Sequence, residues 1–216
     1  MSPSSAGPVR GQSVHLVSEA IRHLILSRSL FPGQQLLQDE LAAKTGFSRG
    51  PMREALRSLT QEGLVTHIPN RGFFVTRFEV SEMKQLYTLR DLVETEVVRS
   101  LPAPTDSQIS TLREVNEQIK APDRTVGEAM RLNREFHFLM FEASPLKLMV
   151  SEIDRWWNMS SSYRMMGIGI WAERAEMMGA AHDAQIDAWA DLDLERLVVL
   201  CHEHRWVSYD RVASII

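Results

Sequence analysis

The chain of 216 residues has little of several features, and each shortage narrows what it can be. It has a single cysteine, Cys201, which excludes an intramolecular disulfide and a thiolate-rich metal site. No stretch approaches the roughly 18 apolar residues of a membrane span. Residues 1–12 lack the apolar run of a secretory signal peptide. We therefore expect a cytoplasmic protein without a membrane partner, in which residues 1–12 form a flexible tail.

Charge is distributed unevenly along the chain, although the whole carries a net charge of only −4. Residues 1–78 contain nine Lys and Arg against five Asp and Glu, which gives a net charge of +4. Residues 79–216 contain fifteen against twenty-three, which gives −8. The positive charge of residues 1–78 makes a polyanion a candidate partner of that part only. Because charge asymmetry alone is weak evidence, this interpretation needs support from sequence motifs.

Residues 13–78 have the pattern of three helices and a β-hairpin. The expected elements are helices over residues 14–28, 38–45 and 48–62 and strands over residues 64–68 and 73–77. Pro32 breaks the first helix, Gly46 stops the second, and Ser48 is a favourable N-cap for the third. A tight turn between two helices, followed by a hairpin, is the order of a winged helix-turn-helix domain.

The remainder of the chain, residues 79–216, has helical periodicity almost throughout. A helix is expected to open at Ser81. Further helices are expected over residues 106–120, 125–143, 146–165, 171–190 and 194–213. The fold class is therefore mainly α: a winged helix-turn-helix domain followed by an all-α antiparallel helical bundle.

The turn before the third helix carries residues that favour DNA. Ser48 and Arg49 stand at the N-terminus of that helix, where free backbone N–H groups and the helix dipole favour a phosphate. Arg49 and Arg53 project from one helix face, and an arginine can read guanine with two hydrogen bonds. Arg71 at the hairpin tip is placed to reach the DNA backbone or a minor groove. Such an arginine pair alone is more often a solvated helix face, but the surrounding turn, cap and hairpin favour DNA.

Three histidines fall on the inward faces of three different expected helices. Asn133 and His137 are four residues apart and share a face, and His182 lies on an apolar stripe. His204 faces inward on the last helix, whereas His202 faces away. Neutral imidazoles with an oxygen ligand suit Zn²⁺ or Ni²⁺ and leave positions open for an acid. Each histidine alone is more simply a hydrogen-bonded core residue, so it is their number and placement that favour a metal ion.

Arg90 is unusual because it interrupts an otherwise apolar helical stripe, and a buried arginine needs a partner. One interpretation pairs it with Glu94, one helical turn away. The other makes it a clamp for the carboxylate of a bound organic acid. Arg164, beside a run of serines, is a second and weaker candidate for the same role. Four tryptophans are candidates either for a cavity wall or for plain core: Trp156, Trp157, Trp171 and Trp189.

A longer set of residues in the N-terminal part carries a family resemblance. Its members are Phe31-Pro32-Gly33, Leu41-Ala42, Gly46-Phe47-Ser48-Arg49, Arg53-Glu54-Ala55-Leu56, Leu59, Glu62-Gly63-Leu64-Val65 and Asn70-Arg71-Gly72-Phe73-Phe74-Val75. Over residues 12–77 the chain resembles the DNA-binding domain of GntR-type regulators. The resemblance implies DNA contacts at Ser48, Arg49, Gly50 and Arg53, with Arg71 and Gly72 in the wing. Asp39 stands where some members have a DNA-contacting arginine, so a different operator preference is expected.

A looser set of residues marks the helical part. Its members are Leu86-Tyr87 with Arg90 and Glu94, Asn133 with Phe136-His137, Ala181-His182 with Ile186, and His204. Residues 79–213 resemble the FCD domain, the effector module of the FadR subgroup. The resemblance implies a metal ion on Asn133, His137, His182 and His204 and a small carboxylate effector on Arg90. FCD metal sites usually have aspartate where this chain has Asn133, so a lower metal affinity is expected.

These features together predict a homodimeric transcription regulator, a repressor, on a pseudo-palindromic DNA operator. A small organic acid bound in the C-terminal domain is expected to change its operator affinity. One alternative is a regulator without an effector, whose C-terminal domain only dimerises. The other is a metal-dependent hydrolase, which is disfavoured because no Glu stands beside a histidine pair as in His-Glu-x-x-His. We expect no enzymatic activity.

Overall fold

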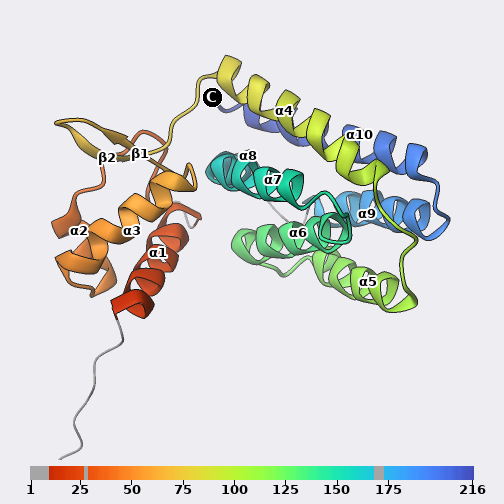
Figure 1. Cartoon of the computed structure of the whole chain (residues 1–216), viewed down its shortest axis with the longest axis horizontal. Helices are drawn as coiled ribbons and strands as arrows, with labels where there is room; N and C mark the ends of the chain where they lie inside the picture. Colours follow the sequence, from red (N-terminus) through yellow and green to blue (C-terminus); the bar gives the residue numbers. More distant parts are fainter. Residues whose placement is uncertain (1–9, 27–28, 168–172) are drawn as a thin grey trace, which may run out of the picture. The chain divides into compact units, whose positions relative to one another are not determined.

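A computed structural model describes residues 10–26, 29–167 and 173–216 and divides the chain into two compact units, Met1–Arg77 and Phe78–Ile216. The first unit contains α1 (Arg10–Leu26), α2 (Gln38–Thr45), α3 (Arg49–Gln61), β1 (Val65–Ile68) and β2 (Gly72–Val75) (Figure 1). The first turn of α1 thus lies within the residues expected to form a tail. The expected winged helix-turn-helix fold is confirmed.

The first unit is held together by apolar stripes that face a shared core. In α3 the buried residues are Met52, Ala55, Leu56 and Leu59, which follow the spacing of one helix face. α1 and α2 both pack against α3, and β1 of the hairpin also contacts α3. In the antiparallel hairpin Val65 lies opposite Val75, and both side chains are buried. The core therefore holds α3 rigidly while its polar face stays exposed.

Backbone geometry sets the turn that presents α3. Gly46 has φ +75°, and its N–H bonds the Ala42 carbonyl at 2.9 Å, which ends α2 in a left-handed cap. Ser48 is extended and precedes the first turn of α3. At the other end of the unit, Asn70 and Gly72 have φ of 62° and 93° and close the wing.

The second unit contains only helices among its described residues. They are α4 (Val80–Arg99), α5 (Asp106–Lys120), α6 (Val126–Phe141), α7 (Lys147–Met159), α8 (Ser161–Gly167), α9 (Ala175–Ala190) and α10 (Leu194–Ala213). α4 packs on α10 and α7, while α5 packs on α6 and α9 (Figure 1). The expected all-α bundle is confirmed. None of the described helices is long and apolar enough to cross a membrane.

Helix starts in the second unit follow from local capping. Three of them have a capping box, in which the cap side chain and the third helical residue bond each other's backbone N–H. The pairs are Glu79 with Glu82, Thr105 with Gln108, and Thr125 with Glu128. The cap of α4 is thus Glu79, two residues before the expected start at Ser81.

The helix expected over residues 146–165 is wrong, because the chain breaks at Ser160 into α7 and α8. The Ser160 hydroxyl bonds the carbonyls of Trp156 and Trp157 at 3.1 and 3.3 Å. Such side-chain bonds compete with the helical ladder, and several serines follow in sequence. The helical spacing of apolar residues continues across Ser160, so the sequence pattern alone could not reveal the break. The expected start of the next helix, residue 171, lies outside the described residues.

The two glycines around the turn should respond differently to substitution. Gly46→Ala should lower the free energy of unfolding by about 1 kcal/mol, because a Cβ disfavours the left-handed conformation. An added Cβ at Gly46 or at Gly50 meets no atom within 4 Å. Neither substitution therefore introduces a clash, and the two variants differ in the backbone conformation of the substituted residue. Gly50→Ala in α3 should leave the stability unchanged or raise it. Chemical denaturation of the full chain measures both, and equal losses would contradict the assigned backbone strain.

Candidate functional site

The N-terminus of α3 is an exposed polar surface. Ser48, Arg49, Gly50 and Arg53 are all exposed. The Ser48 side chain makes no capping hydrogen bond, so its hydroxyl and the first backbone N–H groups of α3 are available to a partner. Anions are favoured at such a helix end by the N–H groups and the helix dipole together. The surface has the chemistry of a phosphate-binding site.

Asp39 contacts this surface directly. Its carboxylate lies 2.6 Å from Arg49 Nε, and the two side chains are 68% and 74% exposed. An ion pair so exposed contributes little stability, so a phosphate can replace the carboxylate at small cost. Asp39, noted in the sequence for a different operator preference, is thus positioned to compete with a phosphate for Arg49.

The wing is anchored behind its tip. Gln35 Nε2 donates to the Arg71 carbonyl at 2.8 Å, and the Arg71 guanidinium lies 5.6 Å from the Phe74 ring. The Arg71 side chain is exposed and Gly72 is half-buried. The tip thus presents a cation on a backbone that is held in place.

In the second unit, three imidazoles meet in the core. His137 of α6, His182 of α9 and His204 of α10 each offer a ring nitrogen, and these nitrogens lie within 4.8 Å of one another. The Nε2 atoms of His137 and His204 are 3.4 Å apart. Two imidazole nitrogens at this distance either share a proton or face a common electrophile. The three expected histidines are therefore brought together.

Asn116 of α5 determines which nitrogen of His182 is free. The His182 Nδ1 lies 3.1 Å from Asn116 Oδ1, and the Asn116 amide group donates to the Gly179 carbonyl and to Asp183. Since Oδ1 only accepts, Nδ1 carries the proton and Nε2 has a lone pair. Nε2 is buried and has no hydrogen-bond partner among the described residues. A ring stacked on Phe136 at 4.0 Å, with Nε2 free, is oriented as a metal ligand.

All three imidazoles are neutral near pH 7. Burial lowers the pKa of His137 and of His182 well below the usual 6.5, and His204 lowers both further. Burial and then the charge of Arg205 lower the pKa of His204 to about 4. The neutral form is the one that binds a metal ion, so these residues need not release a proton on binding.

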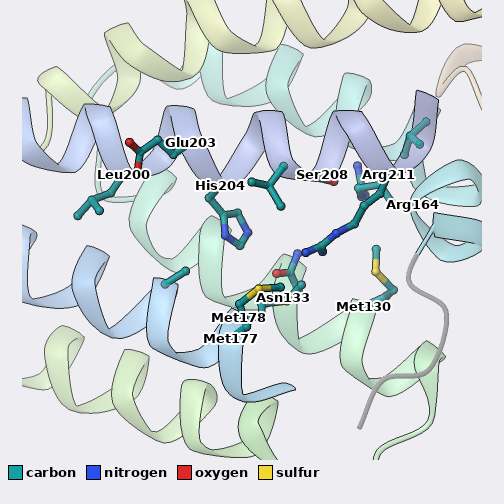
Figure 2. A pocket seen from close by; sticks show the side chains of 13 residues that line it. Met130, Asn133, Arg164, Met177, Met178, Leu200, Glu203, His204, Ser208 and Arg211 are labelled. Atoms are coloured by element: carbon teal, nitrogen blue, oxygen red, sulfur yellow. The ribbon is translucent and has the colours of Figure 1, made fainter. Parts of the chain in front are cut away.

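Two cavities adjoin His204, and the smaller one also adjoins His137. The smaller, about 30 Å³, is lined by Arg90, Glu94, Asn133, His137, Phe141, Trp157, Arg164, Cys201, His204, Arg205 and Ser208. The larger, about 240 Å³, shares Asn133, Arg164, His204 and Ser208 with it. Figure 2 shows the Arg164 side chain reaching toward Asn133, while His204 points from α10 into the same space. Asn133 Oδ1 is buried without a hydrogen-bond partner in the described part of the chain, so this oxygen is free to accept a hydrogen bond or to bind a cation.

Arg90 is engaged in an ion pair. Its Nε donates to Glu94 at 2.8 Å, and both side chains are 4% exposed. Glu94 also accepts from Arg205 Nε at 2.8 Å, and Arg205 bonds Asp91. Burial acts to raise the pKa of Glu94, but the charges and hydrogen bonds of Arg205 and Arg90 outweigh it and hold the pKa below 4.5. The internal pairing considered for Arg90 is therefore present, with Arg205 as a further member.

Arg164 has no such partner. One of its amino groups donates to the Ser160 hydroxyl at 2.6 Å, whereas its buried Nε is without a partner among the described residues. Burial, and then the charge of Arg90, lower its pKa to about 9, so it stays charged at pH 7. Trp157 packs against both guanidiniums, each 4.5 Å from its ring. Of the two arginines considered for a carboxylate, Arg164 is thus the one that lacks a counter-charge in the described part of the chain.

Sequence reasoning missed Asn116 and Arg205. Both residues lie on buried helix faces: Asn116 is next to Val115 and near Ile119, and Arg205 is one turn after Cys201. A polar residue on an otherwise apolar helical stripe is the sequence pattern that could have identified them. Trp189 is core, with its indole N–H bonded to the Pro102 carbonyl. Trp171 lies outside the described residues.

A winged helix-turn-helix unit followed by a helical bundle with a central cavity defines a class of two-domain DNA-binding regulators. A family model described as bacterial regulatory proteins, gntR family, matches residues 15–75, and a model of the FCD domain matches residues 85–205. The chain belongs to the GntR family of transcriptional regulators and carries an FCD domain. Its family is one of regulators and not of enzymes.

Individual relatives agree with this assignment. The chain is 40% identical over 109 residues to the Nta operon transcriptional regulator of Aminobacter aminovorans, covering 50% of this chain and 52% of that protein. It is 25% identical over 144 residues to the repressor RspR of Escherichia coli, covering 65% and 61%. The matches thus span only about half to three fifths of these relatives' lengths.

Solved structures share the fold. Escherichia coli McbR/YncC aligns with a TM-score of 0.80 at 20% identity, over 94% of this chain and 97% of that one. A GntR-type regulator from Rhodococcus sp. RHA1 aligns with a TM-score of 0.76 at 19% identity, over 94% and 98%. At these identities the likeness concerns the fold alone.

Glu94 should be the most costly carboxylate to neutralise in the second unit. Glu94→Gln should lower the free energy of unfolding at pH 7 by about 3 kcal/mol, because two buried arginines lose their shared anion. Since the folded-state pKa lies below 4.5, this stabilisation is present above that pH and is lost as the pH falls through the folded-state pKa.

Denaturant titrations of both forms from pH 7 downward measure the difference. The control is Glu195→Gln, which removes an exposed partner of Arg99 and should change little. A Glu94→Gln protein as stable as the wild type at pH 7 would contradict the role assigned to this carboxylate.

Proposed function

We propose that the chain is a homodimeric transcription repressor, acting in the cytoplasm, whose operator affinity is altered by a small organic acid bound beside a metal ion. One observation carries the proposal. A helix-turn-helix unit is joined to a bundle in which three neutral imidazoles lie together, and one of them, His204, lines a cavity with a buried arginine that has no anionic partner among the described residues. The GntR and FCD matches support each half separately.

For DNA, we assign backbone contacts to Ser48, Gly50 and Gly72 and base or backbone contacts to Arg49, Arg53 and Arg71. The free N–H groups at the start of α3 favour phosphate, and two arginines four residues apart project into the same groove. A homodimer would present two such helices to a pseudo-palindromic operator. The exposure of Ser48, Arg49, Gly50, Arg53 and Arg71 supports this assignment.

Arg49 and Asp39 should act in opposite directions. Arg49→Ala should weaken operator binding, by roughly tenfold or more if it reads a base. Asp39→Ala should strengthen binding, because it frees Arg49 and removes a charge that repels phosphate. Arg131→Ala, which removes an exposed arginine of α6, is the control and should have no effect. Mobility-shift titrations of all variants at one salt concentration measure these operator affinities. If Arg49→Ala binds the operator as tightly as the wild type, Arg49 is not part of the DNA interface.

For the metal ion, we assign His137, His182 and His204 as nitrogen ligands and Asn133 as an oxygen ligand. The residues present fit such a group, since His182 Nε2 and Asn133 Oδ1 are buried polar atoms without partners in the described chain. Zn²⁺ and Ni²⁺ accept this donor set. When bound, the ion would supply a Lewis acid for a carboxylate oxygen. Asn116 would keep the correct tautomer of His182.

Metal content should follow this assignment. His137→Ala combined with His182→Ala should abolish bound metal, whereas His202→Ala, on the exposed side of α10, should retain it. Asn116→Leu should weaken metal binding by roughly ten- to a hundredfold, the usual cost of losing the group that orients a ligand. Asn133→Asp should tighten metal binding, because a carboxylate is a stronger ligand than a neutral amide oxygen.

Elemental analysis and Zn²⁺ titration of protein purified without chelator measure these effects. Absence of metal from the wild type, or its retention in the double variant, would refute the assignment.

For the effector, we assign Arg164 as the carboxylate-binding residue, with Arg90 as a secondary contact. Arg90 already shares Glu94 with Arg205, whereas Arg164 is buried without an anion. A buried cation without a counter-charge is costly, and a bound carboxylate would remove that cost. The same observation disfavours a bundle that only dimerises. The effector would change operator affinity only to the extent that it binds the DNA-binding conformation of the protein and the non-binding conformation with different affinities.

A further inference from the structure

The walls of the larger cavity differ chemically. Four polar residues, which we call the polar corner, line both cavities: Asn133, Arg164, His204 and Ser208. The residues that line only the larger cavity are mostly apolar, and we call this set the methionine wall: Met130, Met177, Met178, Ala181, Leu200, Val207 and Val212. A ligand that fills the space therefore meets hydrogen-bonding groups at one part of its surface and apolar side chains over most of the rest.

The polar corner supplies one uncompensated positive charge. Glu94 pairs with both Arg90 and Arg205, and Asp91 also pairs with Arg205. The two negative charges of these carboxylates therefore equal the two positive charges of the arginines. Arg164 is 7% exposed and has no carboxylate within ion-pair distance among the described residues. Arg164 by itself calls for one anionic group on the ligand, and a divalent ion held by neutral ligands would draw that group to the same polar corner and not to the methionine wall.

The methionine wall offers no buried site for a second anion. The two other charged residues that line the larger cavity are Glu203, which is exposed, and Arg211, which is half-buried, and their charges are opposite. Met177 and Val207 are exposed, but a second carboxylate lying against the buried Met130 and Val212 would lose hydration without a buried partner, which is unfavourable. An alkyl or aryl body would instead be removed from water there, and methionines adapt to its shape.

We propose that the cavity takes a monocarboxylic acid with an apolar body, aryl or branched alkyl, in preference to di- or tricarboxylates. The inference rests on the proposed function, in which this cavity is the effector site. Its carboxylate would sit in the polar corner on Arg164, and its body would lie against the methionine wall. The larger cavity, about 240 Å³, has room for a small acid of this kind.

Matched ligands test the class directly. Calorimetric titration of the full-length, metal-loaded protein would compare hexanoate with adipate, which has the same chain length and a second carboxylate. It would also compare hydrocinnamate with its uncharged amide. We expect hexanoate to bind at least roughly tenfold more tightly than adipate, and hydrocinnamate at least roughly tenfold more tightly than hydrocinnamide, since charge-assisted bonds are the stronger ones. Adipate binding as tightly as hexanoate would overturn the proposal.

Two variants separate the polar corner from the methionine wall. Arg164→Gln should abolish the preference for the acid over the amide. Met178→Thr should weaken hexanoate but not acetate, whereas Met149→Thr, on α7 outside the cavity, should change neither. Thermal unfolding confirms that each variant is folded. Acid binding unchanged by Arg164→Gln would also overturn the proposal.

Operator mobility shifts in the same samples distinguish the two levels of failure. If adipate binds and releases DNA while hexanoate does not, the ligand class is wrong and the effector role stands. If the protein binds its operator but binds neither acid, the effector part of the proposed function fails, and the proposed ligand class fails with it.

Discussion

The second unit is organised around one buried carboxylate. Glu94 on α4 accepts hydrogen bonds from Arg90 on its own helix and from Arg205 on α10, and it therefore ties the two longest helices of the bundle together. A buried charge is tolerated only when it is paired, so both arginines depend on Glu94 in turn. Because this pairing uses Arg90, the cavity is left with Arg164 as its uncompensated cation.

The same charges act on the histidines. Arg205 follows His204 in sequence, and its positive charge adds to burial in lowering the pKa of that imidazole. The cluster is thereby kept neutral, which is the state a metal ion needs, and a protonated cluster would be disfavoured beside so many guanidiniums. The ion pairs of Glu94 with Arg90 and Arg205, the three histidines and the adjoining cavities are therefore parts of one electrostatic arrangement, so removing a charge from one should shift the pKa values in the others.

Much of the fold could be predicted from sequence because its signals are local. The stripe of α3, the left-handed cap at Gly46 and the turn at Asn70 each depend on a few neighbouring residues. The histidines could be assigned to a common core because helical spacing shows which face a residue takes. The break at Ser160 escaped because periodicity on both sides is in phase, while the competing hydrogen bonds from its hydroxyl are visible only in three dimensions.

The sequence by itself determined the order of elements, the family and the residue types available for binding, since these follow from spacing and side-chain chemistry. Only the tertiary structure decided how those residues are paired. Glu94 could have served one arginine or two, Asn116 could have faced any neighbour, and Arg164 could have found an anion. Such choices depend on which helices pack together, because ion pairs and hydrogen bonds across the bundle join residues up to 121 positions apart.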